Sequence, residues 1–293
     1  MANLKEIRTR ITSVKTTRQV TSAMKVVSAA KLKKAQDAIL QIRPYALKLS
    51  ALLSTLSSIL EEEEGSQFTV QRDPEKVLIV VISSNRGLCG GFNSYVTKKA
   101  VALAQTTYAQ QLKAGKLDFI VIGKQAEKIL RSYDFKPVAS YNELFDQMSF
   151  ENGSAIAQGL MDDFVNEKYD RIELVYNNFI NAVIQNQVSE QLLPVPPKVS
   201  EIKAYASVDY IFEPSLEYIV ETLIPRSLKI QFYKALLNSH AAEHGARMTA
   251  MHKATDNATD LINDLTLTFN KARQAAITNA ILEVTNGAEA LNG

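Results

Sequence analysis

The last third of the sequence places apolar residues at alternating spacings of three and four over four heptads. Eight of ten seam positions are apolar, and the seam comprises Met248, Met251, Thr255, Ala258, Ile262, Leu265, Phe269, Ala272, Ala276 and Asn279. A seam of this length predicts a coiled coil rather than an ordinary surface helix. The helical pattern begins near Pro214, and a helix from there to the end would be ~110 Å long, more than a globular core can cover.

The N-terminus offers a helix of the same kind. One heptad run is Leu4, Ile7, Ile11 and Val14, and a second is Ala35, Ala38, Ile42, Tyr45, Leu49, Leu52, Leu56 and Ile59. Between the runs, Val20, Met24 and Val27 indicate a slip of phase, which would locally overwind or unwind a supercoil. We therefore predict an antiparallel pair of long helices made from the two ends of the chain.

The middle of the chain has the alternating pattern of an α/β layer. Strands are predicted at 77–82, 117–122 and 171–176, helices at 92–114, 125–133 and 154–167, and Val183–Ser189 is expected to pair with the third strand. This alternation predicts a mainly parallel sheet. The predicted fold class is α/β: an antiparallel coiled-coil shaft of 1–60 and 210–293, with an inserted Rossmann-like α/β domain at 76–208.

Charge is unevenly distributed along the chain. The whole sequence is +2, but residues 1–34 hold nine cations and a single acid, Glu6, which gives about +8 by count. Such a segment calls for an acidic partner. DNA would be one, but there is no helix-turn-helix or aromatic platform to read it. The single cysteine, Cys89, fits a reducing compartment, and no run of 18 apolar residues could span a membrane.

Gly87-Leu-Cys-Gly90-Gly91 lies between a predicted strand and a predicted helix, where phosphate-binding loops occur. Its spacing matches neither G-x-G-x-x-G nor the P-loop pattern. We interpret it as a tight strand-to-helix turn in which glycines supply positive φ, and we predict no cofactor.

Two clusters on the C-terminal helix could suggest a metal. His240, Glu243 and His244 match H-x-x-E-H, but a zinc peptidase needs a third ligand, and His252 lies about two turns further along the same helix. Asp256, Asp260 and Asp264 form a stripe beside the seam. We expect that stripe to pair with cations of the N-terminal helix, as flanking charges do in coiled coils.

Apolar residues of the C-terminal tip are spread all around the helix. They are Ile277, Ala280, Ile281, Leu282, Val284, Ala288 and Leu291. A helix that is apolar on all sides is expected to be buried on all sides. We predict a sleeve made by other subunits.

Three blocks of sequence together resemble the gamma subunit family of the F-type ATP synthase, the central rotating shaft. The first is Ile7-x-x-x-Ile11 leading into Thr21-Ser-Ala-Met24-Lys25-Val26-Val27-Ser-Ala-Ala-Lys31, and the second is Ser84-Asn-Arg86-Gly87-Leu88-Cys89-Gly90-Gly91-Phe92-Asn93. The third is Glu243-His-Gly-Ala-Arg247-Met248-x-Ala250-Met251, followed by Asn270-Lys-Ala-Arg273-Gln274. The resemblance covers nearly the whole chain, and it makes His240 an addition to a shaft helix rather than half of a metal motif.

The resemblance implies roles for particular residues. Those matching Arg273 and Gln274 would contact a catch loop of a catalytic subunit, Met24 and Lys25 would lie near its acidic lever, and Ile277 and Ile281 would turn in a bearing. The glycine block of Arg86, Gly87, Leu88, Cys89, Gly90, Gly91 and Asn93 would belong to the foot, without a catalytic role.

The implied function is mechanical coupling of proton flow to the catalytic subunits, with no catalysis by this chain. Implied partners are the alpha, beta and epsilon subunits and the membrane c-ring, at the cytoplasmic face of a bacterial cell membrane. A bacterial source is expected because no transit peptide precedes the first heptad. A coiled-coil nucleic-acid scaffold and a zinc peptidase using His240, Glu243 and His244 remain the alternatives.

Overall fold

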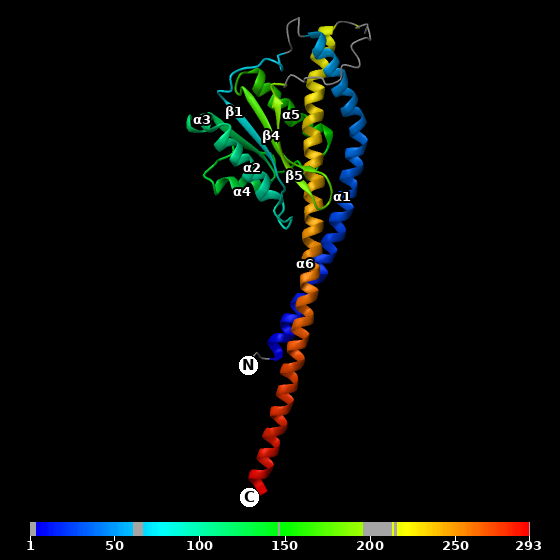
Figure 1. Cartoon of the computed structure of the whole chain (residues 1–293), viewed down its shortest axis with the longest axis vertical. Coiled ribbons are helices and arrows are strands. Elements are labelled where there is room, and N and C mark those ends of the chain that lie inside the picture. Colours follow the sequence, from blue (N-terminus) through cyan, green and yellow to red (C-terminus); the bar gives the residue numbers. More distant parts are fainter. Residues whose placement is uncertain (1–3, 61–66, 146, 196–212, 214–215, 293) are drawn as a thin grey trace. The chain divides into compact units, whose positions relative to one another are not determined.

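The computed structural model describes residues 4–60, 67–145, 147–195, 213 and 216–292 (Figure 1). It divides into two compact units, one of residues 1–28 and 248–293 and one of residues 29–247. Two helices contribute to both units: α1 (Leu4–Leu60) and α6 (Leu216–Asn292). The predicted start near Pro214 lies outside the described residues.

In the first unit, α1 and α6 form an antiparallel pair. The guanidinium of Arg8 lies 5.5 Å from the ring centroid of Phe269, and the hydroxyls of Thr21 and Thr255 lie 2.8 Å apart. The residue numbers rise along one helix as they fall along the other, so the pairing is antiparallel as predicted. The predicted C-terminal seam is covered over its first part, where Met251, Ala258 and Ile262 are buried. Its last two positions, Ala276 and Asn279, are exposed, so the predicted seam is too long at that end.

The predicted slip of phase in α1 is wrong. Val20 and Val27 are 53% and 56% exposed, whereas Thr21 and Ser28 are buried. The residues turned inward keep spacings of three and four throughout, and they are Leu4, Ile7, Ile11, Val14, Arg18, Thr21, Lys25, Ser28, Leu32 and Ala35. Polar residues therefore occupy four consecutive seam positions. The two buried hydroxyls are satisfied, because Thr21 bonds Thr255 and Ser28 donates to the Met24 carbonyl, so their burial costs little.

The second unit contains a five-stranded sheet in the order β3-β2-β1-β4-β5. The strands are β1 (Val77–Ile82), β2 (Leu117–Ile122), β3 (Ala139–Ser140), β4 (Arg171–Phe179) and β5 (Gln185–Leu193). All neighbouring pairs are parallel except β4 and β5. The predicted mainly parallel sheet and the predicted pairing of the 183–189 segment are confirmed, while the two-residue β3 was missed.

The helices of this unit are α2 (Phe92–Thr106), α3 (Ala109–Lys113), α4 (Lys124–Arg131) and α5 (Phe150–Val165). The single helix predicted at 92–114 is two helices. The break falls at Tyr108, whose backbone leaves the helical region at φ −112° and whose hydroxyl donates to Glu173 over 2.7 Å. A buried tertiary hydrogen bond has overridden local helix propensity.

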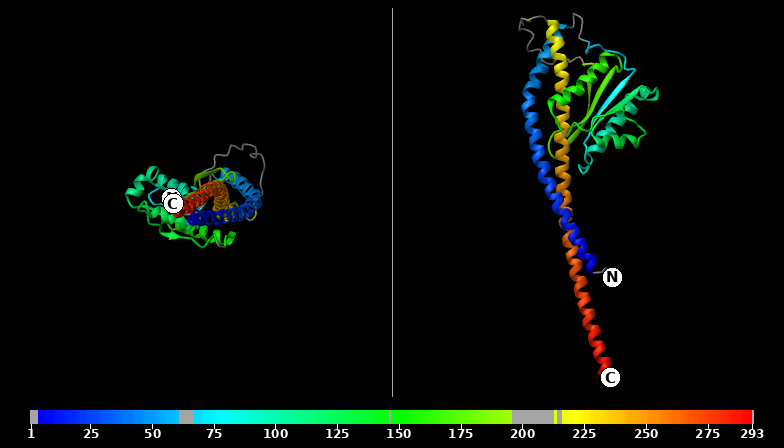
Figure 2. Two further views of the ribbon diagram at one scale, coloured as in Figure 1. Left: turned by 90° about the horizontal axis from the view of Figure 1, so that it is seen from below. Right: turned by 180° about the vertical axis from the view of Figure 1, so that it is seen from behind.

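Helices cover both faces of the sheet (Figure 2). Val77, Ile79 and Val81 of β1 pack with α2 and α4, and the alternate residues Leu78, Val80 and Ile82 pack with α5 and α6. On that second face, Leu228, Phe232 and Leu236 of α6 are buried in the same cluster. The long helix is therefore one layer of the α/β core. The division into a shaft of 1–60 and 210–293 and a domain at 76–208 stays a prediction.

The corrected seam can be tested with two leucines of α1. Leu32 is buried, whereas Leu40, on the same helix, is 61% exposed. Leu32→Ala is expected to lower the free energy of unfolding by about 2–4 kcal/mol through lost burial and a residual cavity. Leu40→Ala should change it by less than about 0.5 kcal/mol. Urea unfolding of the purified chain measures both, and equal losses would contradict the assigned seam.

Candidate functional site

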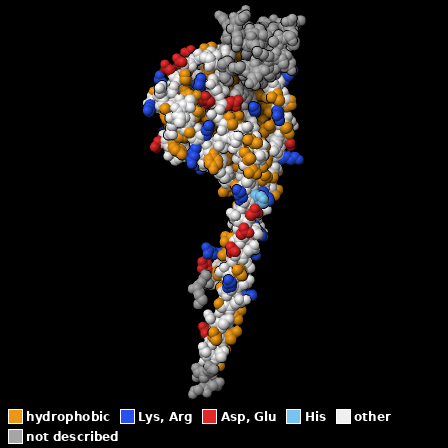
Figure 3. All heavy atoms as spheres, in the orientation of Figure 1, with side chains coloured by type: hydrophobic (Ala, Val, Ile, Leu, Met, Phe, Trp, Pro, Cys, Tyr) orange, Lys and Arg blue, Asp and Glu red, His pale blue; other side chains and the backbone are white. Residues whose placement is uncertain are grey.

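The C-terminal part of α6 leaves its apolar residues uncovered. From Arg273 to Ala288 every described side chain is exposed, and Ile281 and Val284 are 60% and 73% exposed. Figure 3 shows orange apolar side chains along this lower stretch. Ile277, Ile281 and Val284 share one side of the helix, and Leu282 lies about 130° around the helix from the middle of that side. Apolar groups this dense on an uncovered helix indicate a surface for a partner.

The outer face of α1 in the first unit is also apolar, with basic residues around it. Val20, Val26 and Val27 are all more than half exposed. Met24 and Lys25 are partly buried beside them. Residues 4–28 hold six cations and one acid, which is +6 − 1 = +5. This face therefore offers apolar contact within a positive field.

The predicted pairing of the aspartate stripe is wrong. Among the described residues, no ion pair within 4 Å joins Asp256, Asp260 or Asp264 to a lysine or arginine. Asp256 instead lies 3.3 Å from Nδ1 of His252. The three carboxylates are exposed on α6, and nearby Arg8 of α1 stacks on Phe269 instead. The ion pairs predicted between this stripe and the N-terminal helix are therefore not formed among the described residues.

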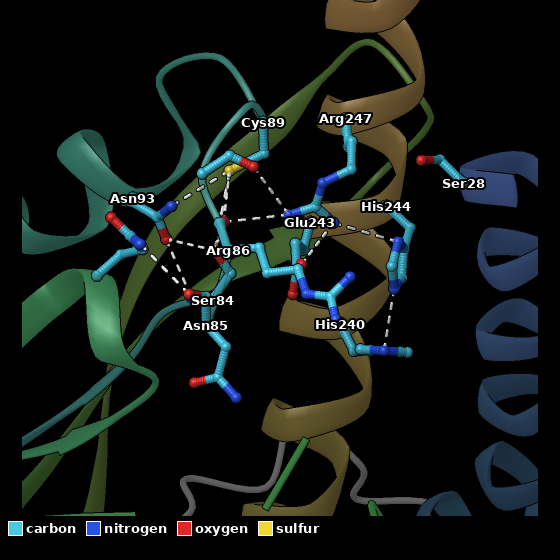
Figure 4. Close-up of polar contacts among 12 residues, drawn as sticks. Ser28, Ser84, Asn85, Arg86, Cys89, Asn93, His240, Glu243, His244 and Arg247 are labelled. Carbon is cyan, nitrogen blue, oxygen red and sulfur yellow. Dashed lines mark hydrogen bonds and ion pairs between the residues drawn. The ribbon is translucent and has the colours of Figure 1, made fainter. Parts of the chain in front are cut away.

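The glycine block forms the connection from β1 to α2 (Figure 4). Gly90 has the expected positive φ, +59°, but so does Leu88, at +61° with 66% of its side chain exposed. A Cβ on Gly91 would meet the ring of Tyr95, an exposed side chain. Asn93 closes the turn by accepting from the Ser84 backbone N–H over 3.0 Å and donating to the Cys89 sulfur over 3.2 Å.

Arg247 of α6 binds this block directly. One terminal nitrogen, Nη2, donates to the carbonyls of Arg86 (3.1 Å) and Gly87 (3.3 Å). The other, Nη1, lies 2.5 Å from Oε1 of Glu243. Both side chains of this ion pair are at least 90% buried. The sequence interpretation gave Arg247 no contact, although an acid and a base four residues apart on a helix signal such a pair.

Helix α6 also fills the place where doubly wound sheets bind ligands. That place is the crevice at the carboxyl ends of strands where the strand order reverses, here between β1 and β4. Ala242 of α6 is buried there against Cys89 and Phe92. A Cβ on Gly245 would lie 3.2 Å from Cα of Ala182, in the turn after β4. The block therefore serves as a packing surface for α6.

The two histidines are linked to Arg247 by a chain of hydrogen bonds. Nη1 of Arg247 lies 3.4 Å from Nδ1 of His244, and Nε2 of His244 lies 3.1 Å from Nε2 of His240. Arginine can only donate, so His244 Nδ1 accepts, and the His244 Nε2–H donates to His240. Since Glu243 binds Arg247, the H-x-x-E-H residues do not converge on a metal. Within the described ranges, no three His, Cys, Asp or Glu side chains do so.

Burial decides the protonation of this cluster. It lowers the pKa of His240 to about 4 and that of His244 to about 3, and nearby positive charges on Lys31 and Arg247 act in the same direction. Burial raises the pKa of Glu243, with Arg247 opposing it. Both histidines are therefore neutral near pH 7, and Arg247 is the buried cation of the cluster.

Comparisons with known proteins agree with one another. A family model described as ATP synthase matches residues 3–291. The ATP synthase gamma chain of Flavobacterium johnsoniae is 58% identical over 294 residues, covering 100% of both chains, and that of Christiangramia forsetii is 55% identical with the same coverage. The chain belongs to the ATP synthase gamma chain family. The resemblance found in the sequence is confirmed, and this family forms the central-stalk rotor subunit of the F-type ATP synthase.

Solved structures support the same fold. The central stalk and c-ring of the Tetrahymena thermophila mitochondrial ATP synthase contain a chain with TM-score 0.60 and 26% identity, matched over 80% of this chain and 99% of that one. A Euglena gracilis ATP synthase chain matches with TM-score 0.65 and 20% identity over 98% and 94% of the two chains. The predicted fold class is confirmed, and the nucleic-acid and peptidase alternatives are not supported. Among the described helices, none is both long and apolar enough to cross a membrane.

The histidine cluster predicts loss of stability in mild acid. In the unfolded chain these histidines would titrate near pKa 6.5, against about 4 and about 3 in the fold. Between pH 6.5 and 4 the unfolded state binds more protons, so stability is full above pH 6.5 and falls as the pH falls. Glu243 partly opposes this trend, because its pKa is raised in the fold and the folded state therefore takes up a proton at a higher pH than the unfolded chain does. His244→Gln should lose less stability than the unaltered chain between pH 7 and 5.

Urea unfolding measures the difference between the free energies of unfolding at pH 7 and pH 5. We expect this difference to be about 1–2 kcal/mol smaller in His244→Gln than in the unaltered chain. His252→Gln is the matched control, because His252 is exposed on the same helix. An unchanged difference in His244→Gln would show that the buried histidines do not control acid stability.

Proposed function

We propose that this chain transmits rotation from the membrane ring of an ATP synthase to its catalytic subunits, coupling proton flow to ATP synthesis. The observation that carries the proposal is the uncovered apolar segment of α6 from Arg273 to Ala288. A lone apolar helix is stable in water only when another protein surrounds it. A rotating tip inside a ring of subunits meets that requirement.

The proposed mechanism depends on a difference between the sides of the α6 tip, of which only one is lined with Ile277, Ile281 and Val284. The tip carries Ile277, Ile281 and Val284 on one side, so turning it presents a different surface to each surrounding subunit. A partner moves a conformational equilibrium only by the difference between its affinities for the states. Successive faces would therefore shift each nucleotide site in turn, and the chain itself would catalyse nothing.

Specific contacts are proposed from the family resemblance and supported by exposure. Arg273 and Gln274 are both exposed at the start of the uncovered segment, where a catch loop of a catalytic subunit would reach them. Met24 and Lys25 lie beside the exposed valines of α1, and the net +5 of that segment would attract an acidic lever. Ile277 and Ile281 would turn in the bearing.

The inserted domain would act as the foot, contacting the epsilon subunit and the c-ring, while the alpha and beta subunits surround the shaft. The glycine block would have a structural role. Bacterial relatives support a peripheral position at the cytoplasmic face of a bacterial cell membrane.

Affinity purification of the chain from its native source should recover six larger nucleotide-binding subunits in stoichiometric amount, and their absence would refute the proposal.

The bearing contact can be tested with charges. The double variant Ile277→Asp/Ile281→Asp should reduce recovery of the larger subunits at least roughly tenfold, because it places two charges where apolar surface would be buried. Circular dichroism should show that the isolated chain is still helical, since both residues are exposed. Val138→Asp, in the inserted domain and 54% exposed, is the control. Full recovery with the double variant would exclude a buried tip.

The catch contact can be tested separately. Arg273→Ala should lower ATP-driven proton pumping per ATP hydrolysed by about tenfold, the effect of losing a charge-assisted hydrogen bond. Lys271→Ala removes an equal charge two residues away, also from an exposed position, and should pump normally. Inverted membrane vesicles with a pH-sensitive dye report the ratio. Equal pumping by both variants would remove Arg273 from the coupling contact without affecting the co-purification result.

A further inference from the structure

Arg247 is the last point along α6 that belongs to the unit containing the sheet, which ends at this residue. Its guanidinium joins two segments far apart in sequence. On one side it holds the carbonyls of Arg86 and Gly87, and on the other the carboxylate of Glu243 (Figure 4). It therefore ties the loop after β1 to α6 at the edge of their contact.

The surrounding contact between α6 and the loops is made of small and apolar groups. Ala242 and Ala246 pack on Cys89, Phe92 and Phe179, and Gly245 lies against Ala182. Such contacts are stabilised by burial, which has no preferred direction. Hydrogen bonds weaken steeply when their angles change. At this edge of the contact, the hydrogen bonds of Arg247 are the interactions that resist sliding of α6 over the loop after β1.

Further up the helix, other polar bonds also join α6 to the sheet. Gln231 donates to Glu190 over 2.7 Å, and the Ser239 hydroxyl donates to the Ile82 carbonyl over 3.4 Å. Gln231 is bonded through a partly exposed side chain, and the Ser239 bond is long. Neither donor carries a charge, whereas Arg247 is a charged donor that binds two loop carbonyls and a carboxylate at once.

The loop that Arg247 holds is already rigid. The Ser84 hydroxyl donates to the Arg86 carbonyl over 2.6 Å, so that carbonyl accepts from both Ser84 and Arg247. Leu88, two residues on, keeps a left-handed backbone that costs a non-glycine residue about 1–2 kcal/mol. Local strain of this kind persists only where its surroundings fix it, and Arg247 is one of the groups that fix it.

We propose that Arg247 is a positioning residue that fixes the rotational register between the inserted domain and α6, so that torque passes from the domain into the helix without slip. The proposal rests on the proposed rotor function. It requires the planar fork of arginine, since one nitrogen serves the loop and the other serves Glu243. A lysine keeps the charge but cannot span both.

The test uses the assembled complex in membrane vesicles, with Arg247→Lys and Arg247→Gln. Both should co-purify with the larger subunits and hydrolyse ATP at a rate near that of the unaltered complex. Proton pumping per ATP hydrolysed should fall roughly threefold or more, because two hydrogen bonds from a charged donor are lost. Lys234→Gln, at an exposed position of α6, is the control and should pump normally.

A disulfide variant distinguishes a loss of rotational register between the inserted domain and α6 from a general loss of folding. Ala182→Cys/Gly245→Cys places two thiols across the same contact. Because a Cβ on Gly245 would press on the backbone of Ala182 at 3.2 Å, the same pair of cysteines with Arg247 intact is the control and should pump normally. In an Arg247→Gln background, oxidation should restore pumping, and reduction should lower it again. Mass spectrometry confirms the bond. If Arg247→Gln does not assemble, Arg247→Lys, which keeps a cation beside Glu243, carries the same test.

Normal pumping by both Arg247 variants would overturn the proposal, and so would low pumping that persists in the oxidised disulfide variant. Failure of the rotor function itself would look different. The unaltered chain would then neither co-purify with nucleotide-binding subunits nor support pumping.

Discussion

The core that α6 shares with the sheet is the interaction on which the other features depend. Leu228, Phe232 and Leu236 are buried against one face of the sheet, and burial stabilises by roughly 1.5–3 kcal/mol for each such side chain. Without α6 the part of that face not covered by α5 would meet water. The helix that the heptad pattern marks as a shaft is therefore also a structural layer of the inserted domain. That shared layer brings Glu243 and Arg247 to the glycine block.

Much of the fold could be predicted because it rests on local patterns. The run Val77–Ile82 is apolar throughout and β-branched at all positions but Leu78, and it is a strand buried on both faces. The seam of α1 was harder, since Thr21 and Ser28 look like surface residues until Thr255 and the Met24 carbonyl are found beside them. The contact of Arg247 with the Gly87 carbonyl joins residues 160 positions apart. No sequence pattern identifies which backbone carbonyl a distant arginine will reach.

The H-x-x-E-H pattern shows how one added contact changes the chemistry of a motif. Helical spacing does bring the two imidazoles together, with their Nε2 atoms 3.1 Å apart. What spacing cannot show is that Glu243 bonds an arginine one turn further on. With Arg247 and Lys31 nearby, positive charge and burial keep both histidines neutral. The acid, the base and the two histidines form one structural network rather than a metal site.

In the first unit, the usual distribution of polar and apolar residues in a coiled coil is partly reversed. Arg18, Thr21 and Lys25 take seam positions, whereas Val20, Val26 and Val27 face outward. A polar seam buries less apolar area between the two helices, so the pair has less stabilisation of its own. The three valines and the uncovered apolar tip leave their apolar area exposed, where another protein can bury it. A helix pair arranged in this way is completed by what surrounds it, which is the physical requirement for a shaft that turns within a ring of other subunits.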